Sequence, residues 1–135
     1  MREIKFRGKN YGGIWLYGYL MPAEKPVINK GCKYRISLSP HACAGKDKIV
    51  YEVITDTIGQ FTGLKDKNGK DIYEEDIMGH PDEPNRCVVF WNGQLAQFQA
   101  NWQNMPTAAD IYTIIKMGYK VIGNIHDNPE LLKSL

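Results

Sequence analysis

Four residues of the types that bind zinc are the first candidates for a chemical site. Thiolate and imidazole groups are common Zn²⁺ ligands, and structural zinc sites hold the ion with four of them. The set consists of Cys32, His41, Cys43 and Cys87. Their spacing fits no common zinc motif, because the sequence contains neither a CxxC nor an HxxxH pair. We therefore predict no metal site and no cofactor, and we expect Cys87 to be a buried strand residue.

A second candidate is the acidic segment between residues 74 and 83. It contains Glu74, Glu75, Asp76, Asp82 and Glu83, with His80 among them. Carboxylates and a histidine are suitable ligands for the magnesium of a phosphodiesterase, provided that they converge on one point. Consecutive residues of a strand point to opposite faces, so a solvated rim is the simpler interpretation. We predict no catalytic residue, and a metal-dependent phosphodiesterase using Asp76, His80 and Asp82 stays as an alternative.

The third candidate is a nucleic-acid-binding surface near the N-terminus. Basic residues alternate in the first segment, and aromatic residues alternate in the next one. The candidate residues are Lys5, Arg7, Lys9, Trp15, Tyr17 and Tyr19. If the basic and aromatic faces coincide, bases stack on the aromatic rings while the cations contact phosphates. The alternative is that the aromatic side chains belong to the core and the basic ones are solvated.

The elements that position these residues are predicted to be strands. Residues 4–7 alternate between apolar and charged types, and residues 14–20 are rich in aromatic and branched types, as half-buried strands are. The turn signal of residues 9–13 lies between them, which predicts an antiparallel hairpin. Residues 34–38 and 49–54 are further candidate strands.

Two Asn-Gly dipeptides predict two more hairpins. Asn68-Gly69 and Asn92-Gly93 both lie between segments of strand character. Asparagine and glycine tolerate the positive φ angles of a two-residue type I′ turn, whose twist suits a hairpin. We expect this turn type at both positions, with a strand beginning at Gln94.

The helical content is predicted to be small. Residues 107–110 resemble a capping box with Asp110 in the position of the usual glutamate, which favours a short helix over residues 107–117. The branched residues that follow favour a strand, and this alternative stays open. At the C-terminus, Asn128 as N-cap and Pro129 in the first helical position predict a short helix, with Leu131, Leu132 and Leu135 on its apolar side.

Many short strands, two hairpin turns and little helix predict a mainly β chain of small barrel-like or sandwich sheets with a short C-terminal helix. We expect an N-terminal β subdomain over residues 1–58. A barrel-like β subdomain with the terminal helix is expected over residues 59–135, packed closely enough against the first to count as one domain. With 43% apolar and 24% charged residues in 135, the composition excludes a disordered chain, a coiled coil and a collagen-like repeat.

The net charge of +2 conceals an uneven distribution. Residues 1–50 contain ten basic and three acidic residues, which gives a net charge of +7. Residues 51–135 contain seven basic and twelve acidic residues, which gives a net charge of −5. A basic half of this kind can meet a polyanion or the acidic half of another copy. The charged N-terminus lacks the apolar stretch of a signal peptide, and no apolar run is long enough to cross a membrane. We therefore expect a cytoplasmic protein with reduced thiols.

Several segments resemble the YopX family. They are residues 2–9, 15–20, 59–74 and 121–132, in the order that the family has them. The resemblance implies a protein encoded by bacteriophages or prophages, mostly β and multimeric, and no established activity from which a catalytic residue could be carried over. One departure is Glu74-Glu75-Asp76, where the family usually has Glu-Gly-Asp, which puts the tight turn at that glycine in question.

The first hypothesis for function is a non-enzymatic phage accessory protein that self-assembles and binds a macromolecular partner, a protein or a nucleic acid, in the cytoplasm of a bacterial host cell. The second is binding of single-stranded nucleic acid through the basic and aromatic residues of the N-terminal hairpin. The third is the metal-dependent phosphodiesterase. A homo-oligomer is expected from the uneven charge.

Overall fold

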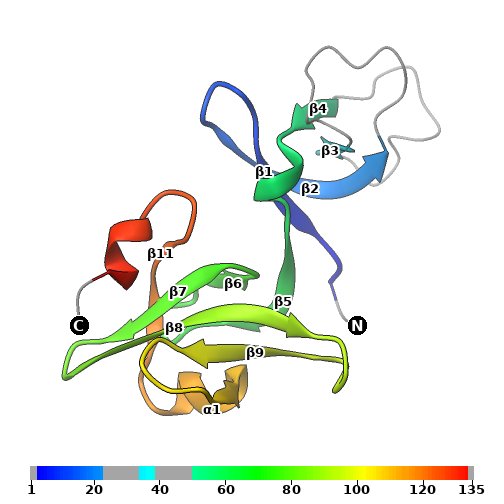
Figure 1. Cartoon of the computed structure of the whole chain (residues 1–135). Helices are drawn as coiled ribbons and strands as arrows, with labels where there is room; N and C mark the ends of the chain where they lie inside the picture. The colour runs from blue at the N-terminus through cyan, green and yellow to red at the C-terminus, as the bar shows by residue number, and fades with distance from the viewer. Residues whose placement is uncertain (1–2, 23–33, 39–49, 134–135) are drawn as a thin grey trace. The chain divides into compact units, whose positions relative to one another are not determined.

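The computed structural model describes residues 3–22, 34–38 and 50–133 of the chain. These residues belong to two compact units, Met1–Phe61 and Thr62–Leu135. Antiparallel strands dominate both units (Figure 1), which confirms the prediction of a mainly β chain. Within the described ranges, neither sheet closes into a barrel. No helix in these ranges combines the length and the apolar character that crossing a bilayer requires.

The first sheet has the strand order β4-β3-β2-β1-β5-β6, of which β1 to β4 lie in the first unit and β6 (Asp71–Tyr73) lies in the second. Its strands are β1 (Phe6–Lys9), β2 (Trp15–Pro22), β3 (Tyr34–Ser37) and β4 (Val50–Val53). A 3₁₀ turn, η1 (Thr55–Thr57), leads to β5 (Gly59–Lys65), which continues into the second unit. The predicted N-terminal hairpin is confirmed, because β1 pairs antiparallel with β2.

Two glycines allow the sheet of the first unit to fold closely onto itself. A Cβ atom on Gly8 would come within 2.9 Å of the Val53 Cβ, and one on Gly18 within 2.1 Å of the Ser37 carbonyl oxygen. Val53 and Ile36 are fully buried on this side of the sheet. Any larger residue at either glycine would therefore push the strands apart.

The second unit contains a sheet with the strand order β10-β9-β8-β7-β11. Its strands are β7 (Asp76–His80), β8 (Glu83–Asn92), β9 (Gln97–Trp102), β10 (Ala108–Asp110) and β11 (Lys120–Asn124). The short strand β6 (Asp71–Tyr73) precedes them, and α1 (Ile111–Lys116) lies between β10 and β11. The core of the unit consists of Ile72, Met78, Cys87, Val89, Ala100, Ile111, Ile114 and Tyr119.

The hairpin at Asn68-Gly69 is present, but its turn is not of type I′. Gly69 has a φ of +80°, whereas Asn68 has no positive φ. The Gly69 N–H donates to the Asp66 carbonyl, and the Asp66 N–H donates to the Lys70 carbonyl, a three-residue loop with one left-handed residue. The Asp66 carboxylate, which accepts from the N–H groups of Asn68 and Lys70, decides the turn type.

The hairpin at Asn92-Gly93 also exists with a different turn. The loop extends over residues 93–96, and the left-handed residue is Ala96, with a φ of 52°, instead of Gly93. The Asn92 side chain accepts hydrogen bonds from the N–H groups of Gln94 and Leu95, which lengthens the loop. The next strand consequently begins at Gln97, not at Gln94 as predicted.

The tight turn before β7 forms despite the absence of glycine. Glu75 has a φ of 70°, a conformation that normally favours glycine. Its N–H donates to the Val89 carbonyl, and its carbonyl accepts from the Ile125 N–H. These long-range hydrogen bonds, together with the contact of the Glu75 carboxylate with His126, hold the glutamate in the strained conformation.

Residues 107–117 contain the strand β10 followed by the helix α1, and the branched residues that favoured a strand lie in the helix, so the helical alternative is the correct one for them. Asp110 is the N-cap of α1, and its carboxylate accepts from the Thr113 N–H at 3.1 Å. The capping box of residues 107–110 predicts Thr107 as the N-cap, so the predicted N-cap is wrong by three residues. The C-terminal helix is the 3₁₀ turn η2 (Pro129–Leu132), and Asn128 makes no side-chain cap to it, because its Oδ1 accepts from the Asn124 N–H. Leu135 lies outside the described residues.

Candidate functional site

The register of the N-terminal hairpin places its basic and aromatic residues on one face. Arg7 lies opposite Tyr17, and Lys9 lies opposite Trp15. Side chains of directly opposite residues project to the same side of a sheet. Within β2, Tyr19 follows on the same side because successive side chains alternate. The basic face of β1 and the aromatic face of β2 therefore coincide, which the sequence alone did not decide.

The cations and the indole ring of this face are in direct contact. The Arg7 guanidinium lies 4.7 Å from the centre of the Trp15 ring, and the Lys9 ammonium lies 5.6 Å from it. Both distances are in the range of cation–π attraction. Arg7 is only 5% exposed, so its guanidinium supports the indole from within the unit. Lys9, half-buried, is better placed to meet an anion.

Two tyrosines of the same face are open to solvent. Tyr17 is 48% exposed and Tyr19 is 41% exposed. They are two residues apart on β2, so their rings follow one another along the strand. This is the arrangement in which successive bases of a single strand can stack.

Lys5 extends this face toward β5. Its ammonium lies 4.7 Å from the centre of the Phe61 ring and 3.7 Å from the Glu3 carboxylate. The Lys5 carbonyl accepts from the Phe61 N–H, which fixes the backbone there. We call the six residues Lys5, Arg7, Lys9, Trp15, Tyr17 and Tyr19 the aromatic–basic face.

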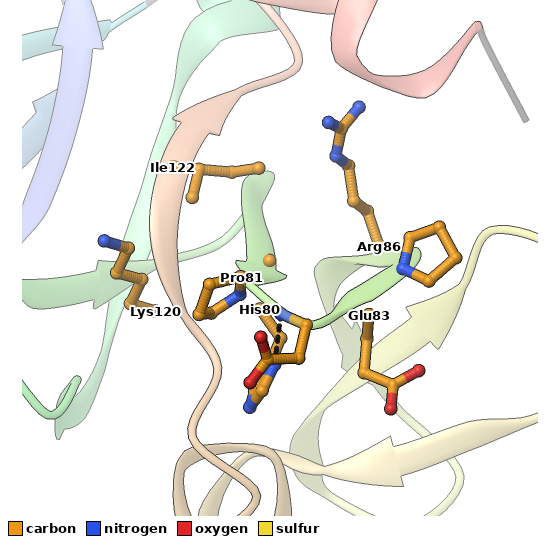
Figure 2. Close-up of a pocket in the computed structure, with 9 residues that line it drawn as sticks. His80, Pro81, Glu83, Arg86, Lys120 and Ile122 are labelled. Carbon is orange, nitrogen blue, oxygen red and sulfur yellow. Dashed lines mark hydrogen bonds between the residues drawn. The ribbon is translucent and has the colours of Figure 1, made fainter.

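A cavity of about 610 Å³ lies in the second unit, beside the β7–β8 turn. Figure 2 shows Arg86 and Lys120 extending from its walls in different directions. Nη1 of Arg86 donates to the Leu131 carbonyl at 2.5 Å, which ties the guanidinium to η2. The charged groups of this cavity therefore do not converge on one point.

The structure does not gather the residues of the alternative hypothesis, a metal-dependent phosphodiesterase. Asp76 is 1% exposed, and its Oδ2 accepts from the Tyr73 N–H at 2.7 Å. Nδ1 of His80 accepts from the Asp82 N–H at 3.0 Å, a contact within the β7–β8 turn. Among the described residues, no three histidine, cysteine, aspartate or glutamate side chains are placed to hold a metal ion.

Of the four candidate zinc ligands, only Cys87 lies among the residues that the structure describes. Cys87 is fully buried in β8, and burial raises the pKa of its thiol to about 12. A thiol with this pKa stays protonated at neutral pH, whereas the thiolate is the form that binds metals. Cys32, His41 and Cys43 lie outside the described residues.

A polar pair that the sequence did not reveal lies in a second cavity, of about 420 Å³, at the turn between β1 and β2. Arg35 and Glu52 are cross-strand partners on β3 and β4, with the guanidinium 3.6 Å from the carboxylate. Tyr11 and Tyr51 also line this cavity. Arg35 and Glu52 are 17 positions apart in the sequence, so only the register of the two strands could have identified the pair.

Comparisons with known proteins agree with this fold. The family profile described as "YopX protein" matches residues 5–133. The crystal structure of protein EF1440 from Enterococcus faecalis is similar, with a TM-score of 0.56 and 24% sequence identity over 98% of this chain and 100% of that chain. At this identity the similarity concerns the fold alone. No curated protein matches the sequence.

Proposed function

We propose that this chain, which belongs to the YopX family, is a non-enzymatic phage accessory protein whose macromolecular partner is single-stranded nucleic acid. The observation that supports this proposal is the register of β1 and β2, which places Lys9 and Arg7 beside Trp15, Tyr17 and Tyr19 on one face. Proteins that bind single strands without strict sequence preference combine aromatic platforms with cationic grooves in this way.

The roles of the residues on the aromatic–basic face differ. Tyr17 and Tyr19, the more exposed residues, stack on bases. Lys5 and Lys9 contact phosphates, and Trp15, with Arg7 beneath it, forms the end of the platform nearest the turn. The positive charge of residues 1–50 attracts the strand before contact.

The proposal is tested by fluorescence anisotropy of the full chain with a labelled dT oligonucleotide at several salt concentrations. We expect binding that weakens steeply as salt rises, because phosphate contacts release counterions. Replacing Tyr17 with Ala should weaken binding by about 5- to 150-fold, since stacking contributes ~1–3 kcal/mol per base. Replacing Lys9 with Gln should reduce the salt slope by about one.

The chain contains a matched control pair. Tyr112 and Lys116 on α1 also form a cation–π contact, at 5.4 Å, and Tyr112 is 59% exposed. Tyr112→Ala and Lys116→Gln should leave oligonucleotide binding unchanged. The proposal fails if the unaltered chain shows no binding at low salt, or if Tyr17→Ala binds as well as the unaltered chain.

Self-assembly is a second candidate function, which the uneven charge favours. The net charge of +7 over residues 1–50 and of −5 over the remainder would let the basic segment of one copy meet the acidic segment of another. Assembly and nucleic-acid binding are compatible, because repeated copies along one strand would increase avidity.

A further inference from the structure

The three aromatic residues of the aromatic–basic face repeat at a fixed spacing. Trp15, Tyr17 and Tyr19 follow one another at every second position of β2. A strand rises ~3.2–3.4 Å per residue, so the side chains of neighbouring members of this row are attached about 6.4–6.8 Å apart. The spacing is a property of the strand backbone, and the three aromatic residues together extend over about 13 Å.

This spacing is about twice the distance between stacked bases. The bases of a helical strand follow one another at about 3.4 Å. A base in the middle of such a stack has both of its faces covered by its neighbours and cannot also stack on a side chain. A base that lies on one ring and a base that enters between two rings both repeat with the spacing of the rings. A strand that stacks successive bases along Tyr17 and Tyr19 must therefore be extended, with its own base stacking broken.

The cations lie to one side of the row of rings. Arg7 and Lys9 are on β1, directly opposite Tyr17 and Trp15, and neighbouring strands are about 4.8 Å apart. Arg7 is nearly buried against the indole ring, whereas Lys9 is half-buried and lies at the end of β1 next to the turn. The phosphates of an extended strand can follow β1 while its bases lie over β2. The bound strand then runs parallel to the axis of β2.

We propose that the aromatic–basic face binds three nucleotides of an unstacked strand and prefers pyrimidine-rich sequences. This inference rests on the proposed function and adds to it the conformation and the composition of the bound strand. Each of the three aromatic residues takes one base. A run of adenines stacks strongly in the free strand and loses that stacking on binding, whereas a run of thymines stacks weakly and loses little. Stacking strength and backbone flexibility are the usual source of pyrimidine preference in proteins that bind single strands.

The first part of the test measures composition by fluorescence anisotropy of the full chain at low salt and 10 °C. The labelled probes are dT24, dA24 and the duplex that the two strands form. We expect dT24 to bind at least fivefold more tightly than dA24, because dA24 has to be unstacked. It should bind at least tenfold more tightly than the duplex, whose bases are both stacked and paired.

The second part measures the length of the site with dT2, dT3, dT4 and dT5. The affinity should rise at least fivefold from dT2 to dT3, because the third base gains a stacking contact of its own. From dT3 to dT5 it should rise less than fourfold, because dT5 only offers three alternative positions to a three-nucleotide site. None of these oligonucleotides is long enough for two such sites, so self-assembly along the strand does not affect the result.

A pair of variants separates the ring of Tyr19 from its place in the strand. Tyr19→Ile keeps an apolar residue that favours strands but removes the ring, and it should weaken binding of dT24 at least fivefold. Tyr19→Phe keeps the ring and should change this affinity less than twofold. Tyr112→Ile on α1, where the tyrosine is 59% exposed, is the matched control and should have no effect. Circular dichroism checks that each variant folds.

The comparisons between oligonucleotides use the unaltered chain, so they decide the inference even if Tyr19→Ile does not fold. Equal or tighter binding of dA24 or of the duplex, an affinity that keeps rising at least fivefold with each nucleotide to dT5, or unchanged binding by folded Tyr19→Ile would overturn this inference alone. Absence of binding to dT24 at low salt would overturn the proposed function as well.

Discussion

The Asp66 carboxylate accepts hydrogen bonds from three backbone N–H groups, those of Asn68, Lys70 and Val121, at 2.9, 3.0 and 3.0 Å. Burial of this carboxyl raises its pKa, but the three donors outweigh burial and lower the pKa below the ordinary value. One side chain thus shapes its own turn and joins that turn to β11.

At the scale of the residue, Asp66→Asn should destabilise the chain at pH 7 by about 2 kcal/mol, because the amide NH₂ would face an N–H donor. The pKa of Asp66 is lower in the folded state than in the unfolded state. The charged carboxylate therefore stabilises the fold fully at pH values above the unfolded-state pKa of about 3.9. This stabilisation is lost as the pH falls through the folded-state pKa of Asp66. The difference between variant and unaltered chain should therefore shrink from pH 7 to pH 3 in urea unfolding.

Asp82→Asn, in the exposed β7–β8 turn, is the control for this measurement, and its effect should stay within about 0.5 kcal/mol. An equal difference for Asp66→Asn at both pH values would show that the charge of Asp66 is not the source of its stabilising effect.

At the scale of the element, α1 depends on its cap more than a longer helix would. It has six residues, too few for an isolated helix to be stable in water. Ile111 and Ile114 are buried in the core of the second unit, and Asp110 accepts hydrogen bonds from both the N–H and the hydroxyl of Thr113. These hydrogen bonds also lower the pKa of Asp110.

Asp110→Ala should therefore lower the free energy of unfolding by about 1 kcal/mol, the usual cost of losing an N-cap. Asp110→Asn should retain most of the stability, since asparagine is also a good N-cap. Urea unfolding followed by circular dichroism measures both variants. Equal stability of Asp110→Ala and the unaltered chain would mean that the burial of Ile111 and Ile114 alone holds α1 in place.

At the scale of the whole molecule, the uneven charge predicts assembly that responds to salt. Contacts between the basic segment of residues 1–50 and the acidic remainder of another copy should be strong at low salt. They should weaken at high salt, because the Debye length falls from about 10 Å at 0.1 M to about 3 Å at 1 M. Light scattering at both salt concentrations measures the mass, and a strict monomer in both would exclude self-assembly.

The local chemistry of the sequence was sufficient for the strands β1 to β4 and for the positions of the hairpins, but it did not predict the strand β10. Alternation predicted that Trp15, Tyr17 and Tyr19 share a face, and the Asn-Gly dipeptides marked both later hairpins. It was not sufficient for the turn types, because side-chain hydrogen bonds of Asp66 and Asn92 competed with the backbone preference of Asn-Gly. The predicted start of the helix was wrong for a related reason. Thr107 and Asp110 are both good N-cap residues, so the sequence alone does not distinguish them. Residues 108–110 pair with β9 as the strand β10, and the helix therefore begins after Asp110.

By itself, the sequence determined that the chain is mainly β, which residues alternate along each strand, and that it belongs to the YopX family. Alternation follows from the pleat of a single strand, so it can be read without knowing the neighbours. Only the tertiary structure decided that Lys9 lies against Trp15 and that Arg35 meets Glu52 beside Tyr11. Register between strands arises from the packing of whole sheets, in which glycines such as Gly8 and Gly18 set how closely the strands approach.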